Sequence, residues 1–125
     1  SLPEYPGKLD GLAVRVPLAI GSLTDLVFLT SRRTTVEEVN RVFAEEANSD
    51  RYRGVLGVTD EPLVSSDIIQ DPRASIVDLD LTQVVDGDLV KVMSWYDNEW
   101  GYTSQMIREA VRIANASKSA GPHAT

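Results

Sequence analysis

The sequence predicts an α+β fold, in which a largely antiparallel, mixed sheet has helices packed on one face. Short runs of aliphatic and β-branched residues, bounded by glycine, proline or aspartate, recur along the chain and predict strands. Two segments, 36–47 and 98–116, instead carry apolar residues at helical spacing. With 125 residues, of which 42% are apolar, the chain is long enough for one folded unit with a core.

The first predicted strand runs from Leu12 to Pro17. Leu12, Val14 and Val16 alternate with Ala13 and Arg15, and proline ends the run. Residues 22–29 predict a second strand. Because Ile20-Gly21 makes a turn between the two, we expect them to pair as an antiparallel hairpin.

The first predicted helix covers residues 36–47. Thr34 and Thr35 are each followed three residues later by a glutamate, which is the pattern of a capping box. A short third strand is predicted at 54–58, and residues 63–69 fit neither a strand nor a helix clearly.

Three strands are predicted in the second half of the chain. Residues 75–78 and 81–85 form two of them, and Asp86-Gly87 is a strong hairpin turn signal. Residues 89–96 are apolar at both odd and even positions, which predicts a central strand covered on both faces. A helix follows from Asn98 to about Ala116, and the Ser/Ala/Gly/Pro composition of 117–125 predicts a disordered tail.

The charge pattern argues against two classes of partner. The net charge is −7, and no basic cluster is longer than Arg32-Arg33. Nucleic acids and anionic membranes are recognised by a concentrated positive surface, so we expect neither as a partner. No apolar run approaches the roughly 20 residues of a transmembrane helix, and no signal peptide pattern opens the sequence. The expected location is the cytoplasm.

The chain offers no catalytic residue of the usual nucleophilic kinds. It has no cysteine, and its single histidine, His123, lies in the predicted tail. A thiol nucleophile is therefore absent, and a serine nucleophile would have no histidine base. No metal site is expected either, because the aspartates between residues 67 and 80 lack calcium-loop spacing.

Three residues remain as candidates for a binding site. A guanidinium such as that of Arg15 can hold a phosphate through two hydrogen bonds, or it can pair with Asp25 across the predicted hairpin. Asn98 can cap the last helix, or its amide can recognise the carboxamide of a ligand. Tyr102, one helical turn later, can line the same pocket or belong to the core.

Four motifs carry a resemblance to a known family, and they follow its order across nearly the whole chain. They are L-P-E-Y-P-G-K-L-D-G-L-A-V-R-V-P at 2–17, T-V-E-E-V-N at 35–40, E-P-L-V-S-S-D-I at 61–68 and W-Y-D-N-E-W-G-Y at 95–102. The chain resembles the C-terminal part of the catalytic domain of phosphorylating glyceraldehyde-3-phosphate dehydrogenases, with residues 1–116 in that domain.

The resemblance implies a cytoplasmic, usually tetrameric, glycolytic enzyme that oxidises glyceraldehyde 3-phosphate with NAD and inorganic phosphate. It implies that Arg15 holds a phosphate, that Asn98 orients the nicotinamide carboxamide and that Tyr102 lies beside that ring. The catalytic cysteine, the active-site histidine and the nucleotide-binding domain of the family have no counterpart in these residues. The resemblance therefore implies a fragment that is inactive alone.

Two alternatives stay open at this point. A fragment of the related erythrose-4-phosphate dehydrogenase is one, although Tyr96 and Tyr102 fit the glyceraldehyde enzyme better. The other is a free-standing, non-catalytic module that uses its sheet to form oligomers or to dock onto a full-length enzyme.

Overall fold

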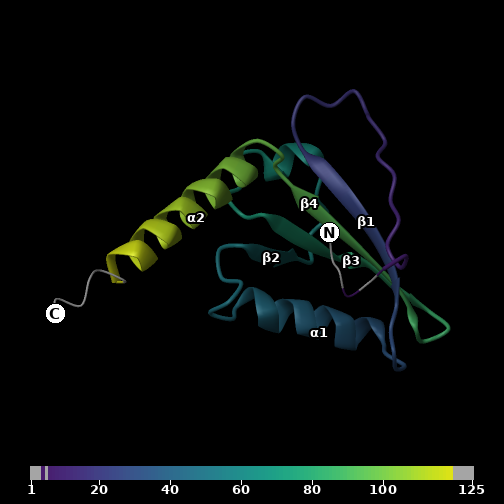
Figure 1. The fold of residues 1–125 in the computed structure, drawn as a ribbon. Helices are drawn as coiled ribbons and strands as arrows, with labels where there is room; N and C mark the ends of the chain where they lie inside the picture. Colours follow the sequence, from purple (N-terminus) through teal and green to yellow (C-terminus); the bar gives the residue numbers. More distant parts are fainter. Residues whose placement is uncertain (1–3, 5, 120–125) are drawn as a thin grey trace.

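The computed structural model describes residue 4 and residues 6–119. Its elements in chain order are β1 (Ser22–Leu29), α1 (Val36–Ala47), β2 (Leu56–Thr59), the 3-10 helix η1 (Ser65–Ile68), β3 (Ser75–Val85), β4 (Leu89–Tyr96) and α2 (Trp100–Ser119). The strands form one sheet in the order β1-β4-β3-β2 (Figure 1). β4 pairs antiparallel with β1 and β3, whereas β2 runs parallel to β3. The predicted α+β class with a largely antiparallel, mixed sheet is confirmed.

Helix α1 covers one face of the sheet. Val39 and Phe43 pack against Val77, Val90 and Val92, which are buried at the centre of that face. The helix starts where its capping pattern predicts, because the Thr35 hydroxyl accepts a hydrogen bond from the Glu38 amide at 3.2 Å. Burial of these aliphatic side chains is the main source of stability for the domain.

The opposite face of the sheet, here called the open face, carries apolar side chains without a helix over them in the described part of the chain. Strand alternation and the pairing register place five exposed residues on it. These are Leu23, Val27, Leu29, Val85 and Leu89. β4 is central in the sheet, as predicted, but the expectation that it is covered on both faces is wrong, because α1 covers only one.

The predicted strands at 75–78 and 81–85 are one element. β3 continues through both, and its register against β4 shifts between Asp78 and Gln83, as in a β-bulge. The hairpin that follows is confirmed: residues 86–88 connect β3 to β4, and Asp86 and Gly87 have φ values of 53° and 76°, in the left-handed region that such a turn uses.

The strand predicted at 12–17 is absent, and so is its hairpin with 22–29. Leu12 and Val14 are 86% and 75% exposed and belong to no strand. The Gly21 amide, in the expected turn, is instead bonded to the Asn98 side chain. Asp25 pairs with Lys91 at 2.9 Å, and within the described residues it forms no ion pair with Arg15, so the predicted Arg15–Asp25 alternative is wrong.

Helix α2 begins beside the sheet and leads away from it (Figure 1). Gln105 and Arg108 tie it to the loops before β2 and β3, through the carbonyl oxygens of Arg53, Gly54 and Pro72. It runs to Ser119, past the predicted start of the tail at 117, while 120–125, with His123, lie outside the described residues. None of the described helices has the length and apolar character to cross a bilayer.

Candidate functional site

The candidate site is the junction between β4 and α2, where Asp97 is the organising residue. Asp97 is 2% exposed. One carboxylate oxygen accepts hydrogen bonds from the amides of Glu99 and Trp100, at 2.9 and 2.7 Å. The other accepts the amide of Gln70 at 2.8 Å. A single buried carboxylate thus joins the end of β4, the start of α2 and the turn that follows η1.

Opposing effects act on the pKa of the Asp97 carboxyl. Burial raises this pKa, as does the neighbouring Asp71 carboxylate, while the three backbone N–H donors lower it. The donors prevail, and the pKa lies below its ordinary value. Asp97 is therefore ionised at neutral pH and acts only as an acceptor.

Asn98 is exposed and does not cap α2, so the structure contradicts that interpretation; the Asp97 carboxylate takes the capping role. The Asn98 side-chain oxygen accepts the Gly21 amide at 3.1 Å, which fixes the side chain against the start of β1. Its Nδ2 group has no hydrogen-bond partner within residues 4 and 6–119. The amide thus keeps two donors for a ligand.

Tyr102 lies in the first turns of α2 and is 70% exposed, so the interpretation as a core residue is wrong. Gly101 next to it is buried, because the chain around Arg73 passes very close: a Cβ on Gly101 would lie 2.7 Å from the Arg73 carbonyl oxygen. Asp71 and Arg73 form an ion pair at 2.7 Å there, and this hydrogen bond holds the pKa of the Asp71 carboxyl below its ordinary value.

Arg15 lies on the segment that leads into Gly21, and its side chain is exposed without a carboxylate partner in the described chain. The structure connects this segment to Asn98 through Gly21. It does not enclose Arg15, Asn98 and Tyr102 in one pocket. The three predicted residues therefore form an open surface.

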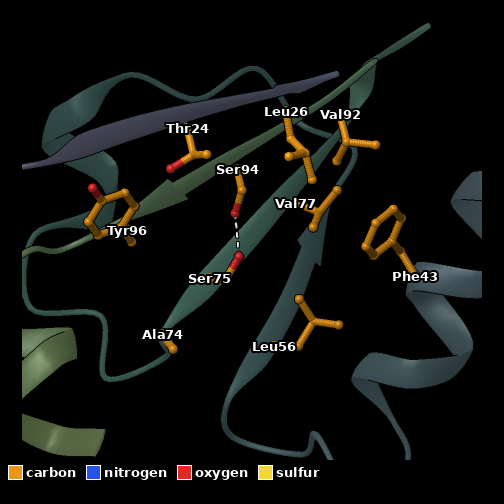
Figure 2. A pocket seen from close by; sticks show the side chains of 10 residues that line it. All are labelled: Thr24, Leu26, Phe43, Leu56, Ala74, Ser75, Val77, Val92, Ser94 and Tyr96. Atoms are coloured by element: carbon orange, nitrogen blue, oxygen red, sulfur yellow. Dashed lines mark hydrogen bonds between the residues drawn. The ribbon is translucent and has the colours of Figure 1, made fainter. Parts of the chain in front are cut away.

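A separate hollow of about 330 Å³ lies on the α1 side of the sheet (Figure 2). Thr24, Ser75, Ser94 and Tyr96 bring hydroxyl groups to it, and the Ser75 and Ser94 hydroxyls are hydrogen-bonded. Its other lining residues are Leu26, Phe43, Leu56, Ala74, Val77 and Val92. None of the three predicted site residues lines it, and without a charged side chain it does not suit a phosphate.

Sequence reasoning missed two residues of the junction. An aspartate just after a strand and before a helix is a capping signal, and Asp97 could have been found in this way. Gln70 carried no signal, because its role depends on its backbone N–H and a positive φ of 65°. No group of three or more metal-ligating side chains occurs in the described part of the chain.

Comparison with known proteins gives a consistent result. A family model described as glyceraldehyde 3-phosphate dehydrogenase, C-terminal domain, matches residues 1–98. Glyceraldehyde-3-phosphate dehydrogenase 3 of Nostoc sp. is 49% identical over 116 residues, covering 93% of this chain and 34% of that protein. The glyceraldehyde-3-phosphate dehydrogenase of Zymomonas mobilis is 48% identical over 90% of this chain and 34% of its own length. The chain spans about one third of the length of these relatives.

Proposed function

Because this chain belongs to the glyceraldehyde 3-phosphate dehydrogenase family, as part of its C-terminal domain, we propose that it forms one wall of the active site of a glycolytic oxidoreductase. The enzyme oxidises glyceraldehyde 3-phosphate to 1,3-bisphosphoglycerate with NAD and inorganic phosphate. The observation that carries the proposal is the Asn98 amide, which is fixed through its oxygen by Gly21 and presents unpaired Nδ2 donors.

The residues at the junction fit a nicotinamide. Asn98 Nδ2 can donate to the carboxamide oxygen of the ring, and the exposed Tyr102 side chain can lie beside the ring. NAD, when bound, accepts the hydride that leaves the substrate. The part of this chain is to orient the ring, since a fixed donor selects one direction of the carboxamide.

Arg15 is proposed to hold a phosphate group, either that of the substrate or the attacking one. A guanidinium can bind two phosphate oxygens at once, and no carboxylate of the described chain competes for it. The 125 residues contain no cysteine, so the thiolate that attacks the aldehyde must come from outside this sequence. The isolated chain is therefore proposed to be inactive, and the complete enzyme to be cytoplasmic.

A hybrid enzyme tests the proposal. In it, this chain replaces the matching C-terminal third of the Zymomonas mobilis relative. We expect the hybrid to form NADH from NAD, glyceraldehyde 3-phosphate and phosphate, and the isolated chain to form none. A folded hybrid without turnover, or turnover by the isolated chain, would contradict the proposal.

Variants of the hybrid assign the roles. Asn98→Ala should raise the KM for NAD, with Glu99→Ala as the neighbouring exposed control. Arg15→Ala should raise the KM for phosphate or for the aldehyde substrate while the KM for NAD stays constant. Arg41→Ala, an exposed arginine on α1, is its control. If Arg15→Ala leaves both the KM for phosphate and the KM for the aldehyde substrate unchanged, Arg15 is an ordinary solvated surface residue.

The open face supports a second proposal, that the protein is a homo-oligomer. Five exposed apolar residues share this face, which is an unusual concentration for a monomer. The same observation favours self-association as the function of the chain if it acts without the rest of the enzyme.

A further inference from the structure

Asp97 and Asn98 are neighbours in the backbone, and a closed series of tertiary contacts, here called the contact loop, also connects their side chains. The Asp97 carboxylate accepts the Gln70 amide at 2.8 Å. Gln70 ends the segment that begins with η1, and this segment packs on Gly21. A Cβ on Gly21 would lie 3.3 Å from both the Ser65 Cβ and the Ile68 Cδ1. Gly21 in turn donates its amide to Asn98 at 3.1 Å, which closes the loop.

The two residues on either side of Asn98 are also fixed in position, by burial or by a hydrogen bond. Asp97 is buried before it, and the Glu99 amide after it donates to the Asp97 carboxylate at 2.9 Å. Gln70 stays in the left-handed region, with φ of 65°, which is unfavourable for a residue other than glycine. The bond from its amide to Asp97 offsets that cost.

We propose that Asp97 is a positioning residue for Asn98, whose carboxylate fixes the direction of the Asn98 amide by holding the η1–Gln70 segment against Gly21. The proposal rests on the proposed function, in which Asn98 contacts the nicotinamide. Burial raises the pKa of the Asp97 carboxyl and three N–H donors lower it below its ordinary value, so the acceptor is present throughout the neutral range.

The Asp97→Asn variant separates this role from helix capping. Asparagine is as good a cap as aspartate, so its oxygen can keep the Glu99 and Trp100 amides. Its NH₂ group would then face the Gln70 amide, which places two donors against each other. Asp97→Ser is a second variant of the same kind, since serine caps helices but its hydroxyl provides one oxygen where Asp97 provides two.

Hydrogen exchange on the 125-residue chain tests the contact loop without any assumption about activity. In Asp97→Asn, the amides of Gln70 and Gly21 should exchange about tenfold faster or more, as loss of a hydrogen bond of about 1.4 kcal/mol produces. The amide of Val92 in β4 serves as the reference. Faster exchange at Gln70 with an unchanged Gly21 would overturn the proposed coupling to Asn98.

Kinetics of the hybrid enzyme test the consequence at the site. Asp97→Asn and Asp97→Ser should raise the KM for NAD about tenfold, with a smaller effect on kcat. Val90→Ala, which weakens the core elsewhere, should lower stability without changing this KM, and Asp50→Asn removes a fully exposed carboxylate as the charge control.

The two proposals can fail separately. If Asn98→Ala leaves the KM for NAD unchanged, the proposed function of Asn98 is wrong. If Asn98→Ala raises this KM and both Asp97 variants leave it unchanged, Asn98 acts but Asp97 does not position it.

Discussion

Gly101 illustrates how a single missing side chain sets the start of α2. The residue is buried, and a Cβ there would lie 2.7 Å from the Arg73 carbonyl oxygen and 3.2 Å from that of Asp71. Replacing glycine by alanine in an exposed helix normally stabilises it by about 1 kcal/mol. At this position the clash is with backbone, which cannot move without displacing the turn before β3.

We therefore expect Gly101→Ala to lower the free energy of unfolding by about 1–3 kcal/mol, measured by urea denaturation. Gly11→Ala is the control, because no atom beyond its two chain neighbours lies within 4 Å of its Cβ position. Equal stability of the two variants would show that the turn yields to the methyl group.

Glu38 predicts a dependence of stability on pH. Hydrogen bonds from Arg32 and Thr34 lower its pKa from 4.5 to about 2 in the folded protein. A carboxyl with a depressed folded pKa stabilises the fold above its ordinary pKa, and this contribution is lost as the pH falls toward the folded value. Stability due to Glu38 is thus complete above about pH 4.5 and disappears toward pH 2.

Unfolding of wild type and Glu38→Gln should be compared across this range. The difference in their free energies of unfolding should narrow as the pH falls from 4.5 toward 2. Glu37→Gln, in the same turn of α1 but exposed, should show no such narrowing. A constant difference for Glu38→Gln would mean that the Arg32–Glu38 pair does not form in solution.

The candidate site could be predicted in part at this scale. Asn98 and Tyr102 were found through a motif, and the structure shows both exposed at the junction. The contacts that hold Asp97 and Asn98 in place could not be predicted. Gln70 and Gly21 contribute backbone N–H groups to them, and these groups are the same in every residue type except proline. The roles of Arg15, Asn98 and Tyr102 remain predictions.

Among the elements, β4 and α1 together carry the core. Val90 is fully buried between them, so Val90→Ala removes two methyl groups and leaves a cavity. We expect a loss of about 2–3 kcal/mol in the free energy of unfolding. Val14→Ala, where the side chain is 75% exposed and lies outside the open face, should cost less than about 0.5 kcal/mol. Similar losses for both would contradict the placement of Val90 at the centre of the core.

The elements that could be predicted are those whose signals are local. The threonine cap of α1, the Asp86-Gly87 turn and the run of β4 each depend on residues within one segment. The segment 12–17 has an equally regular alternation but no strand structure. An alternating pattern shows which face of a possible strand would be apolar. It does not show whether a neighbouring strand is present to form the backbone hydrogen bonds that a strand requires.

For the whole molecule, the open face leads to a prediction about assembly. Val27 and Leu29 lie on it at 55% and 73% exposure. We expect the chain to form oligomers in solution, and the double variant Val27→Lys with Leu29→Lys to shift it to monomers, because two charges would be buried in the interface. The molar mass in solution, from light scattering after size-exclusion chromatography, is the measurement.

A matched control for assembly is the double variant Leu12→Lys with Val14→Lys. These residues are 86% and 75% exposed but lie outside the open face, so the oligomer should persist. A monomeric wild type would contradict the proposal, and dissociation of both variants would place the interface elsewhere.

The strand order also has a consequence for synthesis of the protein. β1 leaves the ribosome before its partner β4, which is made at least sixty residues later, since Leu29 pairs with Leu89 and Ser22 with Tyr96. Contacts this distant in sequence form late in folding, after α1 and the β3–β4 hairpin. Until then β1 is an unpaired strand with exposed apolar side chains, which favours aggregation. Gly21 can therefore reach Asn98 only after the 77 positions that separate them have been translated, so the candidate site forms after α1 and the β3–β4 hairpin.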